Sequence, residues 1–184
     1  NCFGVIAPRA DQPALAEDHA RFRGEAVALI AGERDAVMSL DPDVFPIEWT
    51  PLPPMLEPEL AAADGAPLLH DDRPGNILVR GRVATGDPET ALAGAAHIRT
   101  TSVETSFVEH AYIEPEAGSA WMDGDTLVIQ ACTQAPVMDQ DDVAKVLGLT
   151  RETVRIIPLA AGGGFGSKLD VSLQPLIGLV TLKS

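Results

Sequence analysis

Residues 154–168 read VRIIPLAAGGGFGSK and join a strand signal to a glycine-rich loop. The first four, 154–157, are mostly β-branched and apolar, which predicts a buried strand. Four glycines in the five positions 162–166 cost backbone entropy, so they are expected where the main chain approaches another group closely or takes a positive φ. Residues 170–183 then predict an apolar helix with Pro175 near its first turn.

The glycine-rich loop therefore lies between a predicted strand and a predicted helix. This arrangement turns main-chain N–H groups and a helix N-terminus toward one point, which in physical terms is an anion site. The P-loop pattern fails because Ser167 separates Gly166 from Lys168, and the dinucleotide pattern GxGxxG, counted from Gly162, ends on the same serine. A tight strand-to-helix turn without a ligand explains the same residues and stays open as the alternative.

Phe165 is unusual in this loop because an aromatic side chain between glycines has little local framework to pack on. Two explanations stay open for it. Its ring fills a gap in the core, or it forms one wall of a flat substrate site.

The rest of the second half carries local signals for alternating elements. Asp at an N-cap and Pro at the first helical position are typical of a helix start, and a Gly-containing turn between β-rich runs is typical of a hairpin. The predicted elements are a strand over 76–83, a short helix from Asp87 and Pro88 to 96, a strand over 98–108, a hairpin over 120–130 and a helix over 139–147 ended by Gly148.

The first half has weaker signals and predicts a separate, smaller domain. Its predicted elements are a buried strand over 25–31, one or two helical turns over 34–40, an edge strand over 44–49 and an extended proline-rich segment over 50–58. Residues 59–76 lack periodicity, so we place a domain boundary there, between a domain over 1–65 and a domain over 76–184. The whole is predicted to be of the α/β (α+β) class.

Composition excludes several classes of partner. The 184 residues carry 13 basic and 27 acidic side chains, a net charge of −14, which argues against binding of nucleic acid and of anionic membrane surfaces. No apolar stretch of about 20 residues predicts a membrane span. Cys2 and Cys132 form no CxxC motif and are predicted to be free thiols of a cytoplasmic protein, with an export signal before Asn1 left open.

An acidic segment around His110 offers a second candidate site. Residues 109–116, EHAYIEPE, hold one histidine and three glutamates, and His110 and Glu114 would share one face of a strand. Two candidate ligands do not make a zinc site, because zinc normally takes at least three from the protein. A structural histidine is therefore the favoured interpretation, and no direct metal ligand is assigned.

Several segments, in order, resemble the molybdenum hydroxylase family, which includes xanthine dehydrogenases and aldehyde oxidoreductases. The first half resembles the small α/β hammerhead domain that precedes the molybdenum-binding domains of that family. The segments that carry the resemblance are 11–16 and 24–28 in the first half, and 107–118 (FVEHAYIEPEAG), 121–137 (WMDGDTLVIQACTQAPV), 143–149 (VAKVLGL) and 154–168 in the second.

The resemblance implies a molybdopterin cofactor, with the cytosine dinucleotide form as one alternative. It implies that the amides of Gly163, Gly164, Phe165 and Gly166 bind oxygens of the cofactor and that Phe165 borders the substrate. Purine-oxidising members carry a glutamate where this chain has Leu169, so an aldehyde or an apolar heteroaromatic substrate is favoured over xanthine. A glutamine of the xanthine enzymes is likewise replaced by Val108.

The resemblance also implies what this chain leaves to other parts. The catalytic base of the family is a glutamate near its C-terminus, so no catalytic residue is assigned here and Glu109, Glu114 and Glu116 are not given that role. The [2Fe–2S] clusters and FAD are expected in other domains or subunits, with the remainder of the large subunit as a partner.

Two functional hypotheses follow. In the first, the chain is part of a molybdenum-dependent oxidoreductase that hydroxylates an aldehyde or heteroaromatic substrate with water, hydride passing to the molybdenum centre, and it is inactive alone. In the second, it is a related module that binds a pterin or nucleotide without chemistry.

Overall fold

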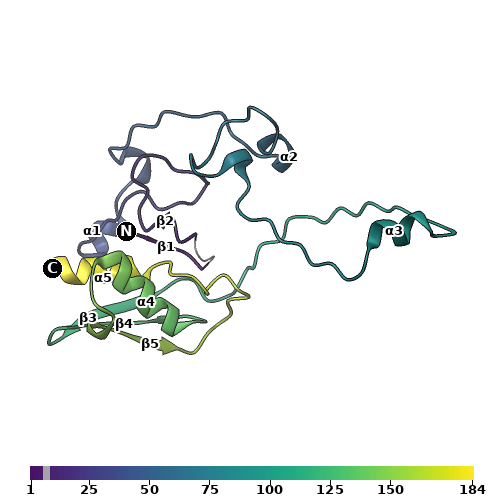
Figure 1. Ribbon diagram of the computed structural model, residues 1–184. Coiled ribbons are helices and arrows are strands. Elements are labelled where there is room, and N and C mark those ends of the chain that lie inside the picture. The colour runs from purple at the N-terminus through teal and green to yellow at the C-terminus, as the bar shows by residue number, and fades with distance from the viewer. Residues whose placement is uncertain (6–8) are drawn as a thin grey trace. The chain divides into compact units, whose positions relative to one another are not determined.

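The computed structural model describes residues 1–5 and 9–184, which divide into two compact units (Figure 1). The first unit combines Asn1–Asp41 with Val108–Ser184, and the second is Pro42–Phe107. Helices and sheets are both present, which confirms the predicted α/β character. The predicted boundary between residues 65 and 76 stays a prediction.

The first unit is built on a three-stranded sheet in the order β3–β4–β5. Strands β3 (Gly118–Asp123) and β4 (Thr126–Cys132) form the antiparallel hairpin predicted around Asp123-Gly124, and Gly124 takes the positive φ of 59° that the turn requires. Strand β5 (Val154–Leu159) pairs in parallel with β4. Because parallel neighbours need a crossover, α4 (Pro136–Leu147) connects them.

Helices α4 and α5 (Gln174–Lys183) pack on one face of this sheet (Figure 1). Gly148 ends α4 in the left-handed conformation with a φ of 70°, as predicted, although α4 begins three residues earlier than expected. The core lies between sheet and helices and contains Phe3, Leu127, Ile129, Ala131, Val143, Ala144, Val154 and Val171. At Gly178 of α5 an added Cβ would lie 3.1 Å from Leu127 and 3.3 Å from Ile129, so this glycine lets the helix approach the sheet closely.

Short elements complete the first unit. Strands β1 (Cys2–Phe3) and β2 (Gln12–Pro13) pair antiparallel, and α1 (Arg34–Met38) confirms the helical turns predicted over 34–40. Cys2 and Cys132 are both free thiols, as expected. No helix in the described part of the chain has the length and apolar character to cross a membrane.

The second unit holds two short helices, α2 (Pro58–Ala61) and α3 (Pro88–Ala93). Asp87 caps α3 by accepting a hydrogen bond from the amide of Thr90, as the sequence predicted, but the helix ends three residues earlier than expected. Asn76 links the end of α2 to the segment that follows it, because its side-chain amide donates to the carbonyl oxygens of Ala61 and Pro67, each at 2.9 Å.

Four predicted strands are wrong. None of these segments pairs with another strand among the described residues, and several of their apolar side chains are exposed, including Val83, Val103 and Phe107. A strand is stable only when its main-chain groups find a partner, which composition alone does not guarantee. The segments concerned are 25–31, 44–49, 76–83 and 98–108.

Candidate functional site

The candidate site lies where β4 and β5 end. Because the two strands are parallel and Cys132 is in register with Leu159, both carboxyl ends meet at one edge of the sheet. Residues following β4 therefore lie beside the glycine-rich loop that follows β5. Ligands of open α/β sheets bind at such an edge, outside the carboxyl ends of the strands.

The glycine-rich loop leaves three consecutive amides without a protein acceptor. Gly162 N donates to Glu114 Oε2 at 2.9 Å, and Gly166 N donates to Gln134 Oε1 at 3.0 Å. Between them, among the described residues, the N–H groups of residues 163–165 donate to no protein atom. Consecutive free amides in a loop are able to bind an anion or an oxygen-rich ligand.

The backbone of the loop takes conformations that favour glycine. Gly163 has a φ of 112° and Gly166 a φ of 95°, and Phe165 adopts a positive φ of 48°. Added Cβ atoms would also collide with neighbours, at 2.5 Å from Glu114 for Gly162 and at 2.8 Å from Tyr112 for Gly163. The glycines are therefore required both by the turn and by the close packing of residues 112–114 against it.

Phe165 points outward from this loop with 74% of its surface exposed. The alternative in which its ring fills a gap in the core is therefore wrong. Leu169 is 40% exposed, so the two predicted pocket residues both present apolar surface outside the core. An exposed aromatic side chain beside free amides suits contact with a flat ligand.

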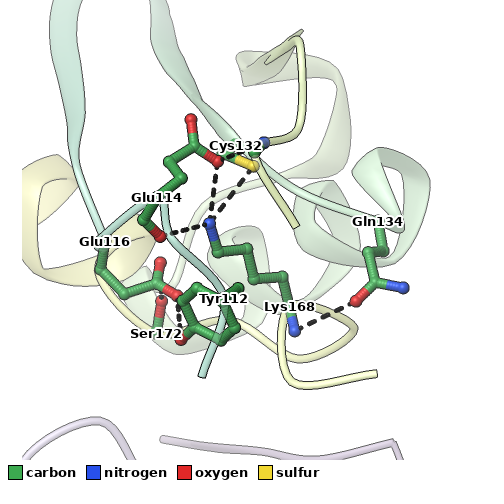
Figure 2. A network of polar contacts seen from close by, with 8 residues as sticks. Tyr112, Glu114, Glu116, Cys132, Gln134, Lys168 and Ser172 are labelled. Carbon is green, nitrogen blue, oxygen red and sulfur yellow. Dashed lines mark hydrogen bonds and ion pairs between the residues drawn. The ribbon is translucent and has the colours of Figure 1, made fainter. Parts of the chain in front are cut away.

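Lys168 is the main residue that sequence analysis missed. Its side chain is only 2% exposed, and its ammonium donates to Glu114 Oε2 at 2.9 Å, to the Glu114 carbonyl oxygen at 3.1 Å and to Cys132 Sγ at 3.5 Å (Figure 2). The ammonium also lies 4.5 Å from the centroid of the Tyr112 ring. A buried lysine needs such partners, because burial of an unpaired charge is costly.

Gln134 binds the main chain of Lys168, at the opposite end of the residue from its ammonium. Its side-chain oxygen accepts from the amides of Gly166 and Lys168, at 3.0 Å and 3.3 Å. Its own main-chain amide donates to the Lys168 carbonyl oxygen at 2.9 Å. Figure 2 shows Lys168 held between Gln134 at its main chain and Glu114 at its ammonium.

A second acid of the segment, Glu116, is engaged elsewhere in the same cluster. Glu116 accepts hydrogen bonds from the Tyr112 hydroxyl at 2.9 Å and from Ser172 Oγ at 3.0 Å (Figure 2). The bond to Glu116 raises the pKa of Tyr112.

His110 lies 3.8 Å from Glu109, and no group of three potential ligands that could hold a metal ion occurs among residues 1–5 and 9–184.

The electrostatics of the Lys168 cluster keep the ion pair charged. Hydrogen bonding from Cys132, from the Lys168 ammonium and from the Gly162 amide lowers the pKa of Glu114 to about 2. Burial alone would lower the pKa of Lys168, but its bonds to Glu114 and Cys132 outweigh burial and raise it. Burial and the neighbouring Glu114 raise the pKa of the Cys132 thiol. At neutral pH the cluster therefore contains a carboxylate, an ammonium and a protonated thiol.

Stability should depend on pH through Glu114. The pKa of Glu114 in the folded chain, about 2, lies below its ordinary value of 4.5. Between these two pH values the unfolded chain therefore binds about one more proton than the folded chain. The contribution of Glu114 to the stability of the fold is complete above pH 4.5 and is lost as the pH falls toward 2. We expect the unfolding temperature of Glu114→Gln to lie below that of the wild type at pH 7, and the gap to close by pH 2. Thermal unfolding of both proteins at matched pH values measures this, and a gap that is constant with pH would contradict it.

Free amides at the carboxyl ends of parallel strands are able to bind an anionic or oxygen-rich group through the main chain. Residues 69–184 match the molybdopterin cofactor-binding domain family, and the chain belongs to this family. The oxygens of such a cofactor fit the three N–H donors at residues 163–165, so the donor set agrees with the family.

The chain is also similar, along most of its length, to subunits of xanthine and nicotinate dehydrogenases. It is 33% identical to a probable subunit of xanthine dehydrogenase from Bacillus subtilis, over 100% of this chain and 24% of that protein. It is 33% identical to the large molybdopterin subunit of nicotinate dehydrogenase from Eubacterium barkeri, over 98% of this chain and 42% of that one. It is 30% identical to the molybdenum-binding subunit of xanthine dehydrogenase from Escherichia coli, over 92% of this chain and 22% of that protein. The chain thus spans less than half the length of these relatives.

Proposed function

We propose that this chain is part of a molybdenum-dependent oxidoreductase that hydroxylates an aldehyde or a heteroaromatic substrate with oxygen from water. The observation that carries the proposal is the row of free amides at residues 163–165, beside the exposed ring of Phe165. When bound, the molybdenum cofactor supplies the oxygen-transfer and hydride-accepting chemistry. One relative supports the substrate class, since the nicotinate after which it is named contains a heteroaromatic ring that is not a purine.

In this proposal, residues of the chain bind and orient rather than transfer protons. The amides of Gly163, Gly164 and Phe165 hold oxygens of a molybdopterin, in its simple or its cytosine dinucleotide form. The fourth predicted donor, Gly166, already donates to Gln134, so it contributes by fixing the end of the loop. Phe165 and Leu169 form an apolar wall, which offers no hydrogen bond to the polar edge of a purine and favours an aldehyde or an apolar ring.

The catalytic base is proposed to lie outside this chain. A base must accept a proton near neutral pH, and a carboxylate with a pKa of about 2 that is paired with Lys168 does so poorly, which removes Glu114. Glu116 is occupied by Tyr112 and Ser172. The hammerhead assignment of residues 1–65, the cofactor-binding domain over 76–184, and the [2Fe–2S] and FAD partners belong to the same proposal, as does a cytoplasmic location.

The test is to purify the natural protein that contains this chain and to measure its molybdenum and pterin content. We expect about one molybdenum per chain and turnover of aldehydes or pyridine-type heterocycles with an artificial electron acceptor. Product formed in ¹⁸O-labelled water should carry the label. Molybdenum without turnover would favour the non-catalytic binding module, and a protein without molybdenum or pterin would overturn both hypotheses.

A further inference from the structure

A single carboxylate oxygen bonds to residues on both sides of the three free amides. Glu114 Oε2 accepts hydrogen bonds from Gly162 N, at the first glycine of the loop, and from Lys168 Nζ, two residues beyond its last glycine, each at 2.9 Å. The Glu114 amide also donates to the Gly162 carbonyl oxygen at 3.4 Å. One side chain thereby closes the loop across the free amides.

The Lys168 ammonium fixes that carboxylate in place. It holds both the side-chain oxygen and the main-chain oxygen of Glu114, so rotation of the Glu114 side chain would break the bond to Oε2. The ammonium itself is restrained by Cys132 Sγ and by the Tyr112 ring. The lysine has little freedom, because its side chain is 2% exposed.

The pair also removes a charge conflict. A loop that binds an anionic group lies against a carboxylate in a chain whose net charge is −14. The ammonium at 2.9 Å neutralises Glu114, so the carboxylate is able to accept the Gly162 amide without repelling a neighbouring anion. Loss of Lys168 would therefore change both the shape and the local charge of the loop.

We propose that Lys168 and Glu114 are a positioning pair that closes the loop and holds the free amides of residues 163–165 in the conformation that binds the cofactor. The inference rests on the proposed function, because it assigns that loop to the cofactor. Neither side chain is required to touch the cofactor or the substrate. Lys168 acts through Glu114, and Glu114 acts through the amide of Gly162.

The experiment uses the purified natural protein and four variants: Lys168→Met, Lys168→Arg, Glu114→Gln and the double variant Lys168→Met with Glu114→Gln. Lys145→Met, at an exposed lysine of α4, is the matched control. Molybdenum per chain after gel filtration and the molybdenum EPR signal are measured beside circular dichroism. Loss of a group that orients the binding residues typically weakens metal retention about 10- to 100-fold.

We expect Lys168→Met to bind about tenfold less molybdenum than the wild type, or less still. Lys168→Arg should bind more molybdenum than Lys168→Met, since arginine keeps the positive charge. The double variant should lose less than the product of the two single losses, because removal of both charges leaves no unpaired carboxylate. Wild-type molybdenum content and an unchanged EPR signal in Lys168→Met would overturn the inference while leaving the proposed function intact. Absence of molybdenum from the wild type would instead overturn the proposed function and this inference with it.

If Lys168→Met does not fold, Glu114→Gln decides the question. The amide has the shape of the carboxylate but lacks its charge, so the fold is expected to survive with a circular dichroism spectrum like that of the wild type. We then expect an altered EPR signal and about tenfold faster loss of molybdenum on dialysis. An EPR signal and a rate of molybdenum loss equal to those of Lys145→Met would overturn the inference.

Discussion

Replacement of Gly163 with alanine is expected to lower bound molybdenum by about tenfold or more, because this glycine is constrained in two independent ways. Its φ of 112° is strained for any residue with a Cβ, at a cost of about 1–3 kcal/mol. The added Cβ would also lie 2.8 Å from the Cβ of Tyr112. Tyr112 cannot move aside freely, since its hydroxyl is bonded to Glu116 and its ring lies against Lys168.

Two matched glycine variants separate these causes. Gly166→Ala has a φ of 95° but no atom within 4 Å of the new Cβ, so it reports backbone strain alone. Gly81→Ala, in open space and without a positive φ, should behave as the wild type. Molybdenum per chain and the unfolding temperature are measured for all three. Equal molybdenum in Gly163→Ala and Gly81→Ala would show that the conformation of the loop does not matter for binding.

The elements that sequence predicted well are those specified by nearby residues. The hairpin over 120–130 depends on the turn at Gly124, and the end of α4 depends on Gly148, so both signals lie within or next to the element itself. The strand β5 was predicted from four residues that pair with the adjacent strand of the same βαβ unit. Where pairing partners lie close in sequence, composition and structure agree.

The strands predicted over 76–83 and 98–108 failed for the opposite reason. Their composition favours a strand, but Val83 and Phe107 are almost fully exposed and no neighbouring strand is present among the described residues. The propensity of a residue for a strand is chiefly a preference for a paired, half-buried surface. A single sequence does not show whether that surface exists.

The same distinction, between local and long-range signals, separates the features of the candidate site that the sequence predicts from those that it does not. The glycines mark the loop because their need for a positive φ is a local property. The burial of Lys168 was not predictable, because its partner Glu114 lies 54 positions away and a lysine at the end of a loop is normally solvated. Residues 109–116 contain potential metal ligands, but in the structure Glu114 forms an ion pair with Lys168 and accepts a hydrogen bond from the amide of Gly162.

The framework under this site depends on Ile129, and truncation of this side chain should cost about 3–4 kcal/mol of the free energy of unfolding. Ile129 is fully buried in β4, the central strand of the sheet. Gly178 faces it from α5 and has no side chain to fill the space left by Ile129→Ala. The cavity should therefore persist, which keeps the cost away from the low end of the range of about 2–5 kcal/mol for such substitutions.

Urea unfolding followed by circular dichroism measures this cost, with Ile113→Ala as a control at a side chain that is 96% exposed. The control should change the free energy of unfolding by no more than about 0.5 kcal/mol. A lower urea concentration at the unfolding midpoint, with an unchanged m-value, would show that Ile129→Ala weakens the native state without changing its compactness. Because β4 leads directly to Cys132 and Gln134, the same truncation should weaken the support of Lys168. A cost below about 1 kcal/mol would mean that α5 closes onto the sheet at Gly178 and that the edge carrying the loop is more deformable than its packing indicates.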